Sequence, residues 1–193
     1  AEHYNRIIAA AQAQMPIQNV QPPRSDLDDE IDEDGDDFAP SYQSNGNGYS
    51  ANVGATAATD SFSIAYSGAL AKSQNYQAGG DFKTTRVTGR LGHTLPLNEV
   101  GSTAYDTRNQ TLDFAWKNGI HKVEAQIRYQ DIPQELFPNQ RMDMLGNEQK
   151  SFDLNYTGDF NWGKLEAQAY YQKVDHFMDF GPDKRFWYGT ATG

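Results

Sequence analysis

Cysteine does not occur in this 193-residue chain. The chain therefore has no disulfide framework, no thiolate metal site and no thiol nucleophile. It also lacks any run near the ~20 consecutive apolar residues that a membrane-spanning helix requires, so insertion through helices is excluded. A mean hydropathy of −0.78, with only 37% hydrophobic residues, makes the chain poor material for a water-soluble core.

Basic residues are missing where acidic residues are densest. Residues 26–37 carry nine acidic side chains and no Lys or Arg, and removing those nine charges from the net charge of −10 leaves −1 elsewhere. This balance argues against nucleic acid as a partner. Residues 30–41 partly match an EF-hand loop, but Ser41 stands where a bidentate Glu is required. A solvated segment is therefore favoured over weak divalent-cation binding.

The first 46 residues are expected to form an N-terminal helix and an acidic linker. Residues 1–16 are Ala-rich, and Pro16 ends the helix that they predict. Pro22, Pro23 and the acidic run then favour an extended or disordered linker. No signal peptide is visible at the start, which lacks a basic segment followed by an apolar one.

From about residue 47 the pattern changes to an alternation of large apolar with polar or small residues. Leu112, Phe114 and Trp116, for example, are separated by Asp113 and Ala115. Such alternation gives a strand one apolar and one polar face. Tight turns pair the segments into three hairpins. We count about six strands, over residues 49–57, 61–70, 111–116, 122–129, 152–156 and 164–171.

Connections between these segments alternate in length. The hairpin turns are short, whereas residues 75–103, 131–149 and 176–193 form long connections, as in outer-membrane barrels. A soluble sandwich is the alternative, and it would bury the apolar face. Aromatic residues near the strand ends favour a lipid interface: Trp116, Tyr129, Tyr156, Trp162 and Tyr171. The predicted fold class is all-β, an antiparallel transmembrane β-barrel segment of about six strands with a helical or disordered N-terminal extension.

Four segments carry a resemblance to a known family. They are SFSIAYSGALAKSQNYQAGGDFK from Ser61, YDTRNQTLDF at residues 105–114, NYTGDFNWGKLEAQAYYQ from Asn155 and, most specifically, FPNQRMDM at residues 137–144. With them, residues 49–189 resemble part of a TonB-dependent receptor barrel, more narrowly its copper-receptor branch. The resemblance implies an outer-membrane location, lipid around the barrel, and ligand import energised by the inner-membrane TonB complex.

Receptors of this family have a barrel of about twenty-two strands closed by an N-terminal plug. Six strands do not close such a barrel, and residues 1–40 contain neither a recognisable plug nor a TonB box. We therefore expect residues 47–193 to be a partial barrel. Other barrel segments or chains must then cover its edges, because each unpaired backbone group costs several kcal/mol in lipid.

His176 and Met178 are the main candidate metal ligands. Even-numbered residues of the strand that begins near residue 164 are polar, and the same parity places both side chains on the inward face. Imidazole nitrogen together with thioether sulfur favours copper, particularly Cu(I), over hard cations. The resemblance implies that a Cys and a Met from the plug complete such a site. The alternative is a polar lumen residue beside a packing residue.

Met142 and Met144 form a second candidate pair for a soft metal, although packing within a folded loop is the favoured interpretation. His3, His93 and His121 have no partner at ligand spacing. No Ser-His-Asp order, glycine-rich phosphate loop or rigidly spaced carboxylate pair is present, so we do not expect an enzyme. Charged inward-facing residues are expected to form cross-strand ion pairs: Lys122, Glu124, Arg128, Lys164 and Glu166.

These patterns leave three functions open. The first is part of a receptor that imports copper or a copper complex, for which the His176 and Met178 pair is the discriminating feature. The second keeps the family but has haem or a siderophore as its ligand. Loop aromatics would then contact the ligand, namely Phe137, Phe186, Trp187 and Tyr188. The third is a β-rich surface binding protein without transport activity.

Overall fold

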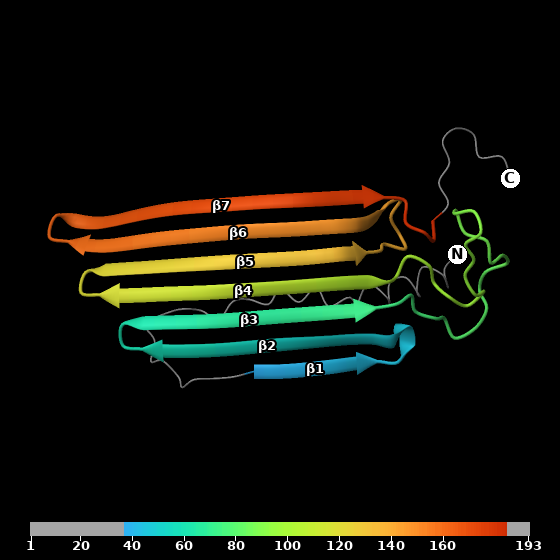
Figure 1. Ribbon diagram of the computed structural model, residues 1–193, viewed down its shortest axis with the longest axis horizontal. Helices are drawn as coiled ribbons and strands as arrows, with labels where there is room; N and C mark the ends of the chain where they lie inside the picture. Colours follow the sequence, from blue (N-terminus) through green and yellow to red (C-terminus); the bar gives the residue numbers. More distant parts are fainter. Residues whose placement is uncertain (1–36, 185–193) are drawn as a thin grey trace.

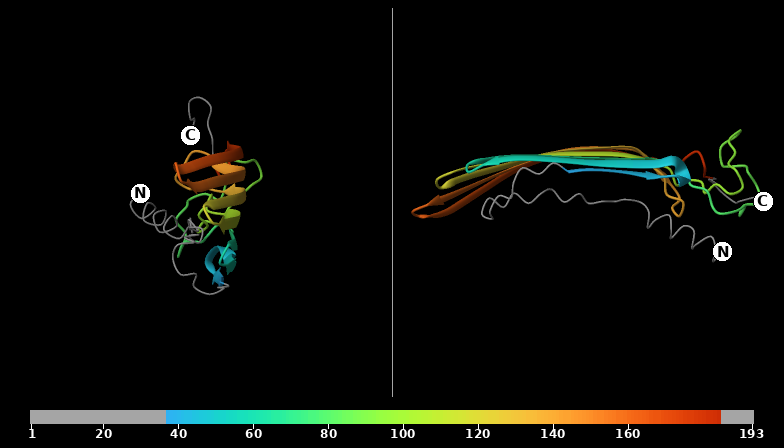
Figure 2. Two further views of the ribbon diagram at one scale, coloured as in Figure 1. Left: turned by 90° about the vertical axis from the view of Figure 1, so that its left-hand side faces the viewer. Right: turned by 90° about the horizontal axis from the view of Figure 1, so that it is seen from below.

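The protein folds into one antiparallel sheet, which a computed structural model describes over residues 37–184. Each strand pairs with its sequence neighbour, so the sheet is a meander one layer thick (Figures 1 and 2). A short 3-10 helix, η1 (Asn45–Asn47), joins the first two strands. The seven strands are β1 (Asp37–Gln43), β2 (Gly48–Thr59), β3 (Phe62–Ser73), β4 (Tyr105–Asn118), β5 (His121–Glu135), β6 (Asp143–Phe160) and β7 (Gly163–Asp179). The prediction of an all-β, antiparallel fold is confirmed.

The structure corrects the expected count of about six strands to seven, because β1 lies in the segment that was interpreted as a linker. β1 pairs with β2 along its whole length, and Phe38 and Tyr42 share one face of it. Pro40 and the preceding acidic residues conceal this strand in the sequence. Proline is tolerated there because β1 is an edge of the sheet within the described residues. The helix expected over residues 1–16 lies outside the described residues, as does most of the acidic run.

Tight turns gather at one end of the sheet and long connections at the other (Figure 1). Two-residue turns join β2 to β3, β4 to β5 and β6 to β7. Gly119, in the second of these turns, has a left-handed φ of +58°, which glycine adopts without steric cost. The opposite end carries η1, residues 74–104 and residues 136–142. The long connection expected at residues 75–103 is confirmed, and β5 and β6 extend into the one expected at residues 131–149. Of the third, expected at residues 176–193, residues 176–179 belong to β7 and residues 185–193 lie outside the described residues.

The two faces of the sheet differ in chemistry. Directly paired residues of antiparallel strands point to the same face, so the register identifies rows of neighbouring side chains. One row, on what we call the apolar face, consists of Ala57, Ile64, Phe114, Ala125, Leu154 and Ala169. The adjacent row, on what we call the polar face, consists of Thr56, Ala65, Asp113, Gln126, Asp153 and Tyr170.

Aromatic rings border the apolar face at the tight-turn end. Phe160 and Trp162 stack with their ring centroids 5.0 Å apart. The Tyr156 hydroxyl lies 2.7 Å from His121 Nδ1, and their rings also stack. These side chains combine an apolar body with a polar edge, which suits a boundary between an apolar and an aqueous medium.

Ion pairs border the apolar face at the long-loop end, and we call them the charged border. Lys72 Nζ lies 2.9 Å from an Asp106 carboxylate oxygen, and Arg108 lies 3.1 Å from Asp131. The charged border continues on the last two strands with the pairs Lys150–Glu148 and Lys173–Asp175. Apolar surface is thus confined to a band between aromatic rings and charges.

The buried core of the described residues is small and lies mainly at the loop end. The two largest fully buried side chains are Val100, which is 1% exposed, and Asp143, which is 0% exposed. Large side chains of the apolar face, such as Ile127 and Leu165, remain exposed. A single-layer sheet that exposes an apolar face is unfavourable in water, so something beyond residues 37–184 must cover it. No helix within these residues is long and apolar enough to cross a membrane.

Candidate functional site

β7 carries His176 and Met178 on the polar face, near the long-loop end of the sheet. The two residues are two positions apart in one strand, so their side chains point the same way. Asn147 of β6 is paired with His176, and its Oδ1 lies 2.9 Å from His176 Nδ1. His176 is exposed and Met178 is half-buried. This shared face is the one that the sequence parity indicates, and the role of both residues as metal ligands stays a prediction.

Two neighbouring strands, β5 and β6, each contain a β-bulge near His176. β5 has one extra residue relative to β4 around Pro133, and β6 has Leu145 as an extra residue relative to β7. Proline cannot donate a backbone hydrogen bond, which makes it compatible with such a bulge. A one-residue shift moves every side chain beyond it to the other face. Met144 is consequently paired with Met178 and lies on the polar face.

The structure separates the two methionines of the FPNQRMDM segment. Met142 lies in the loop before β6 and is 40% exposed, whereas Met144 lies in β6 and is 7% exposed. Met142 thus precedes the strand and Met144 lies within it, and the role of either residue as a metal ligand stays a prediction. Met144 is the residue of β6 that is paired with Met178 of β7.

A chain of side-chain amides crosses the polar face and ends at His176. Gln130 Nε2 donates to Asn109 Oδ1 at 2.8 Å, and Asn147 Nδ2 donates to Gln130 Oε1 at 3.0 Å. Asn147 therefore presents Oδ1 to the imidazole, and an amide oxygen only accepts hydrogen bonds. For a neutral imidazole this arrangement assigns the donated proton to Nδ1 and leaves the lone pair on Nε2.

The charges of the polar face pair mostly within strands. Side chains at i and i+2 of one strand share a face, so an acid and a base at that spacing meet easily. The pairs of this kind are Lys122–Glu124 at 3.1 Å and Lys164–Glu166 at 2.7 Å. Among the five charged residues expected to pair across strands, Arg128 does so, with Asp153 of β6. Its Nε also donates to Ser151 Oγ at 3.2 Å.

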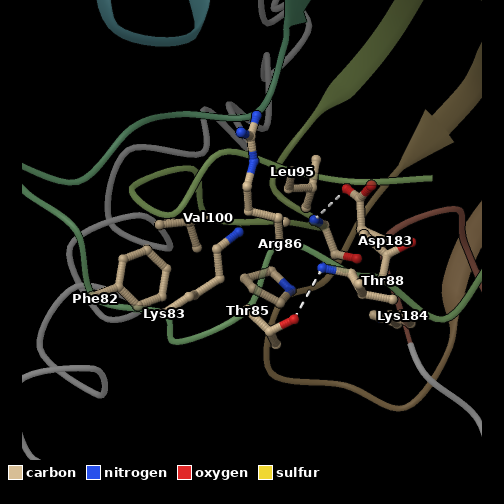
Figure 3. Close-up of a pocket in the computed structure, with 13 residues that line it drawn as sticks. Phe82, Lys83, Thr85, Arg86, Thr88, Leu95, Val100, Asp183 and Lys184 are labelled. Atoms are coloured by element: carbon tan, nitrogen blue, oxygen red, sulfur yellow. Dashed lines mark hydrogen bonds between the residues drawn. The ribbon is translucent and has the colours of Figure 1, made fainter. Parts of the chain in front are cut away.

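The long loops form a pocket of about 280 Å³ beside Asp183 (Figure 3). Leu95 and Val100 supply apolar wall, and Lys83 and Arg86 bring cationic groups to it. Burial lowers the pKa of the Lys83 ammonium below its ordinary value. An apolar wall with cations at its edge suits an organic anion.

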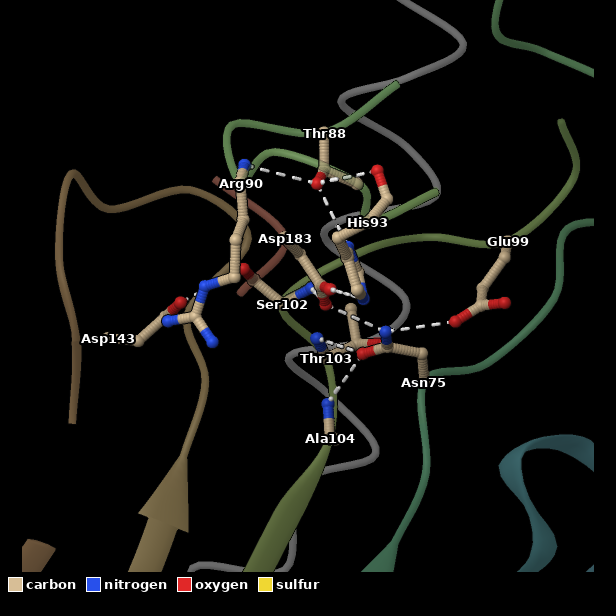
Figure 4. Close-up of polar contacts among 10 residues, drawn as sticks. All are labelled: Asn75, Thr88, Arg90, His93, Glu99, Ser102, Thr103, Ala104, Asp143 and Asp183. Atoms are coloured by element: carbon tan, nitrogen blue, oxygen red, sulfur yellow. Dashed lines mark hydrogen bonds and ion pairs between the residues drawn. The ribbon is translucent and has the colours of Figure 1, made fainter. Parts of the chain in front are cut away.

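Asn75 is the centre of a cluster of polar contacts at the same end (Figure 4). Its Oδ1 accepts the backbone amides of Thr103 and Ala104 at 2.9 and 3.0 Å, and its Nδ2 donates to Asp183 Oδ2 at 2.8 Å. The Ser102 amide donates to the same Asp183 oxygen at 2.8 Å. The cluster fixes residues 101–104 against the segment that follows β7.

Asp143 joins three loop segments with one buried carboxylate. Its Oδ1 accepts the Phe137 amide at 2.8 Å and lies 2.6 Å from Lys184 Nζ. Its Oδ2 accepts the Ser102 hydroxyl at 3.1 Å. Sequence reasoning missed both Asp143 and Asn75, because their partners lie far away in the sequence, up to 108 residues for Asn75 and Asp183. No local spacing pattern signals such contacts.

The described part of the chain holds no group of three or more His, Cys, Asp or Glu side chains arranged for a metal ion. Methionine sulfur is a further donor that soft metal ions accept. Met144 and Met178, beside His176, are the methionines that the sheet brings together.

Comparison with known proteins supports the fold. No family model matches the chain, and no curated protein matches it in sequence. Among solved structures, it is similar to one described as "Copper transporter OprC", with a TM-score of 0.56 and 19% sequence identity. The match covers 86% of this chain and 22% of that chain. The likeness thus shows the fold of the sheet, and this chain spans about a fifth of the length of that transporter.

Replacing Asp143 by Ala is expected to loosen the long-loop end. The change leaves Lys184, whose side chain is 11% exposed, as a buried charge without its carboxylate, at a cost of about 3–5 kcal/mol. Hydrogen exchange in residues 101–104 and 136–142 should accelerate strongly, while amides near the tight turns keep their protection. Asp60→Ala, in the exposed β2–β3 turn, is the matched control. Unchanged loop protection in Asp143→Ala would contradict the role given to this carboxylate.

Proposed function

We propose that this chain forms part of the barrel wall of a TonB-dependent outer-membrane receptor that imports copper or a copper complex. The observation that carries the proposal is the position of His176 and Met178 on the polar face of a sheet whose fold resembles that of a copper transporter. An imidazole and a thioether form a soft donor pair, which favours Cu(I) over hard cations.

The apolar face supports contact with lipid. From Phe160 to Lys150, β6 advances about 33 Å at ~3.3 Å per residue. A strand tilt of ~40° reduces this to a height of ~25 Å, which is that of the apolar band of outer-membrane barrels. The aromatic rings at one border and the charged border at the other then lie at the two interfaces, where such side chains are favoured.

The polar face supports contact with water and with a plug. Its row of Asp113, Gln126 and Asp153 would be costly against lipid and is satisfied in a hydrated interior. Within the described residues, β1 and β7 are edges with unpaired backbone groups. Further strands of the same barrel are the proposed partners for these edges, and the TonB complex is the proposed source of energy. In this function the chain is a ligand-uptake component and not an enzyme.

A receptor for an organic ligand is the second candidate, and the pocket in the long loops favours it. Lys83 and Arg86 beside Leu95 and Val100 suit an anionic ligand with apolar parts, such as a carboxylate siderophore. Of the loop aromatics expected to contact such a ligand, Phe137 begins the loop before β6. The other three, at residues 186–188, lie outside the described residues.

Titration of the full-length protein with Cu(I), under reducing conditions and in detergent, tests the copper function. His176→Ala and Met178→Leu should each weaken binding by at least about tenfold, because each removes one soft donor. Met142→Leu, at an exposed methionine outside the site, should bind as the wild type does. Wild-type protein that binds no Cu(I), or variants that bind it equally well, would refute the copper function and favour the organic ligand.

Arginine substitutions at adjacent positions of β7 test the assignment of the two faces. Ala169→Arg places a charge in the middle of the apolar face, where a barrel loses about 2–4 kcal/mol, and should reduce the amount of folded receptor in the outer membrane. Gln168→Arg places the same side chain on the polar face and should be tolerated. Membrane fractionation with a heat-modifiability assay measures both. Equal effects of the two variants would contradict a lipid-facing apolar side.

A further inference from the structure

Asp183 lines the pocket of the long loops with a carboxylate of which only one oxygen is satisfied. Its Oδ2 accepts the Asn75 side-chain amide and the Ser102 backbone amide, each at 2.8 Å. Its Oδ1 lies 3.7 Å from His93 Nε2, which is too long for a hydrogen bond, and no other group of residues 37–184 donates to it. The side chain is only 4% exposed (Figure 3). A carboxylate oxygen so little exposed to water requires a donor, and a ligand in the pocket can supply one.

Two cations of the same pocket also lack a partner within the described residues. Neither Lys83 nor Arg86 lies within ion-pair distance of a carboxylate there, whereas each cation of the charged border has such a partner. Lys83 is half-buried and Arg86 is exposed. An ammonium and a guanidinium group at one pocket, both without a counter-charge, are suited to bind a carboxylate.

The free carboxylate oxygen and the cations belong to one pocket with an apolar wall. Leu95 and Asp183 lie against the same backbone position, Gly101. A Cβ atom there would stand 2.8 Å from Leu95 Cδ1 and 3.0 Å from Asp183 Cβ, so any other residue would push these side chains away. The glycine therefore keeps the carboxylate directly beside the apolar wall that Leu95 and Val100 form.

We infer that this pocket binds a small zwitterion, whose carboxylate lies against Lys83 and Arg86 and whose ammonium group donates to Asp183 Oδ1. The volume of about 280 Å³ is at the lower limit of ligand pockets, ~300–1,000 Å³, and therefore suits a molecule of amino-acid size. The inference goes beyond the copper function. It rests on the second candidate function and deepens it, because it adds an ammonium group that the organic ligand must carry.

The charges of the pocket select a ligand that carries both signs. A dicarboxylate would bring a second negative group to Asp183, and like charges repel strongly where little water screens them. A simple amine would leave Lys83 and Arg86 without a partner. Lys184 does not alter this balance, because its ammonium nitrogen lies 2.6 Å from Asp143 Oδ1. A zwitterion satisfies both sides of the pocket at once.

NMR titration of the full-length protein in detergent, with four compounds, tests this inference. Leucine is the zwitterion, 4-methylpentanoate is the same molecule without its ammonium group, and 3-methylbutylamine is the same molecule without its carboxylate. Citrate represents an anion of several carboxylates. Leucine should bind at least about tenfold more tightly than each of the other three, because each of them loses a charge-assisted hydrogen bond or meets a like charge.

Variants of the pocket distinguish its two sides. Arg86→Gln, at an exposed position, should weaken the binding of leucine about tenfold and leave that of 3-methylbutylamine unchanged. Asp183→Asn should weaken the binding of both amines and leave that of 4-methylpentanoate unchanged or stronger. Hydrogen exchange in residues 101–104 shows whether this second variant keeps the loop structure. Arg141→Gln, at an exposed arginine outside the pocket, is the matched control and should bind leucine as the wild type does.

The outcomes separate this inference from the functions proposed above. Binding of 4-methylpentanoate as tight as that of leucine, or leucine binding that Arg86→Gln leaves unchanged, overturns the inference. If citrate then binds the wild type and is lost in Arg86→Gln, the receptor for an organic anion stands without the zwitterion. A wild-type protein that binds none of the four compounds overturns both. The copper function is decided separately, by the Cu(I) titration.

Discussion

A sheet one layer thick, with one apolar and one polar face, places a constraint on everything else in this structure. Neither face is covered by another element of residues 37–184, and the buried core is limited mainly to the loop end. Burying apolar area is the main favourable term in folding, so the sheet requires a second medium or further chain on its apolar side. In the proposed function, lipid on that side and a hydrated lumen on the other satisfy both faces at once.

The same constraint explains where chemistry can occur. Along a regular strand each side chain points to one face of the sheet. The register of the neighbouring strands then determines which side chains lie next to it on that face. Departures from regularity are therefore the places where unusual groups of side chains meet. The extra residues at Pro133 and Leu145 bring Met144 to Met178 and His176, and the amide chain through Asn147 reaches the same place. Bulges commonly re-aim side chains near functional sites in this way.

The loop end has a different organisation from the sheet. Asp143 and Asn75 each join segments that are distant in sequence through hydrogen bonds of a carboxylate or an amide. These contacts hold the loops in one arrangement beside the strand ends that carry His176. The loops thus give a fixed surrounding to both the candidate copper ligands and the cationic pocket, although the two sites use opposite kinds of chemistry.

The alternation of apolar and polar residues by itself predicted six of the strands, the hairpin turns between them and the two faces of the sheet. It also predicted the face on which His176 and Met178 lie. These features are accessible from the sequence because a period of two residues is a local property of the chain. Tertiary structure alone decided what depends on register and on distant partners. β1 is recognisable only through its pairing with β2, Met144 reaches Met178 only because two strands carry an extra residue, and Asp143 is buried only by loops that meet in space. Pairing energies between distant segments set these features, and no spacing within one segment encodes them.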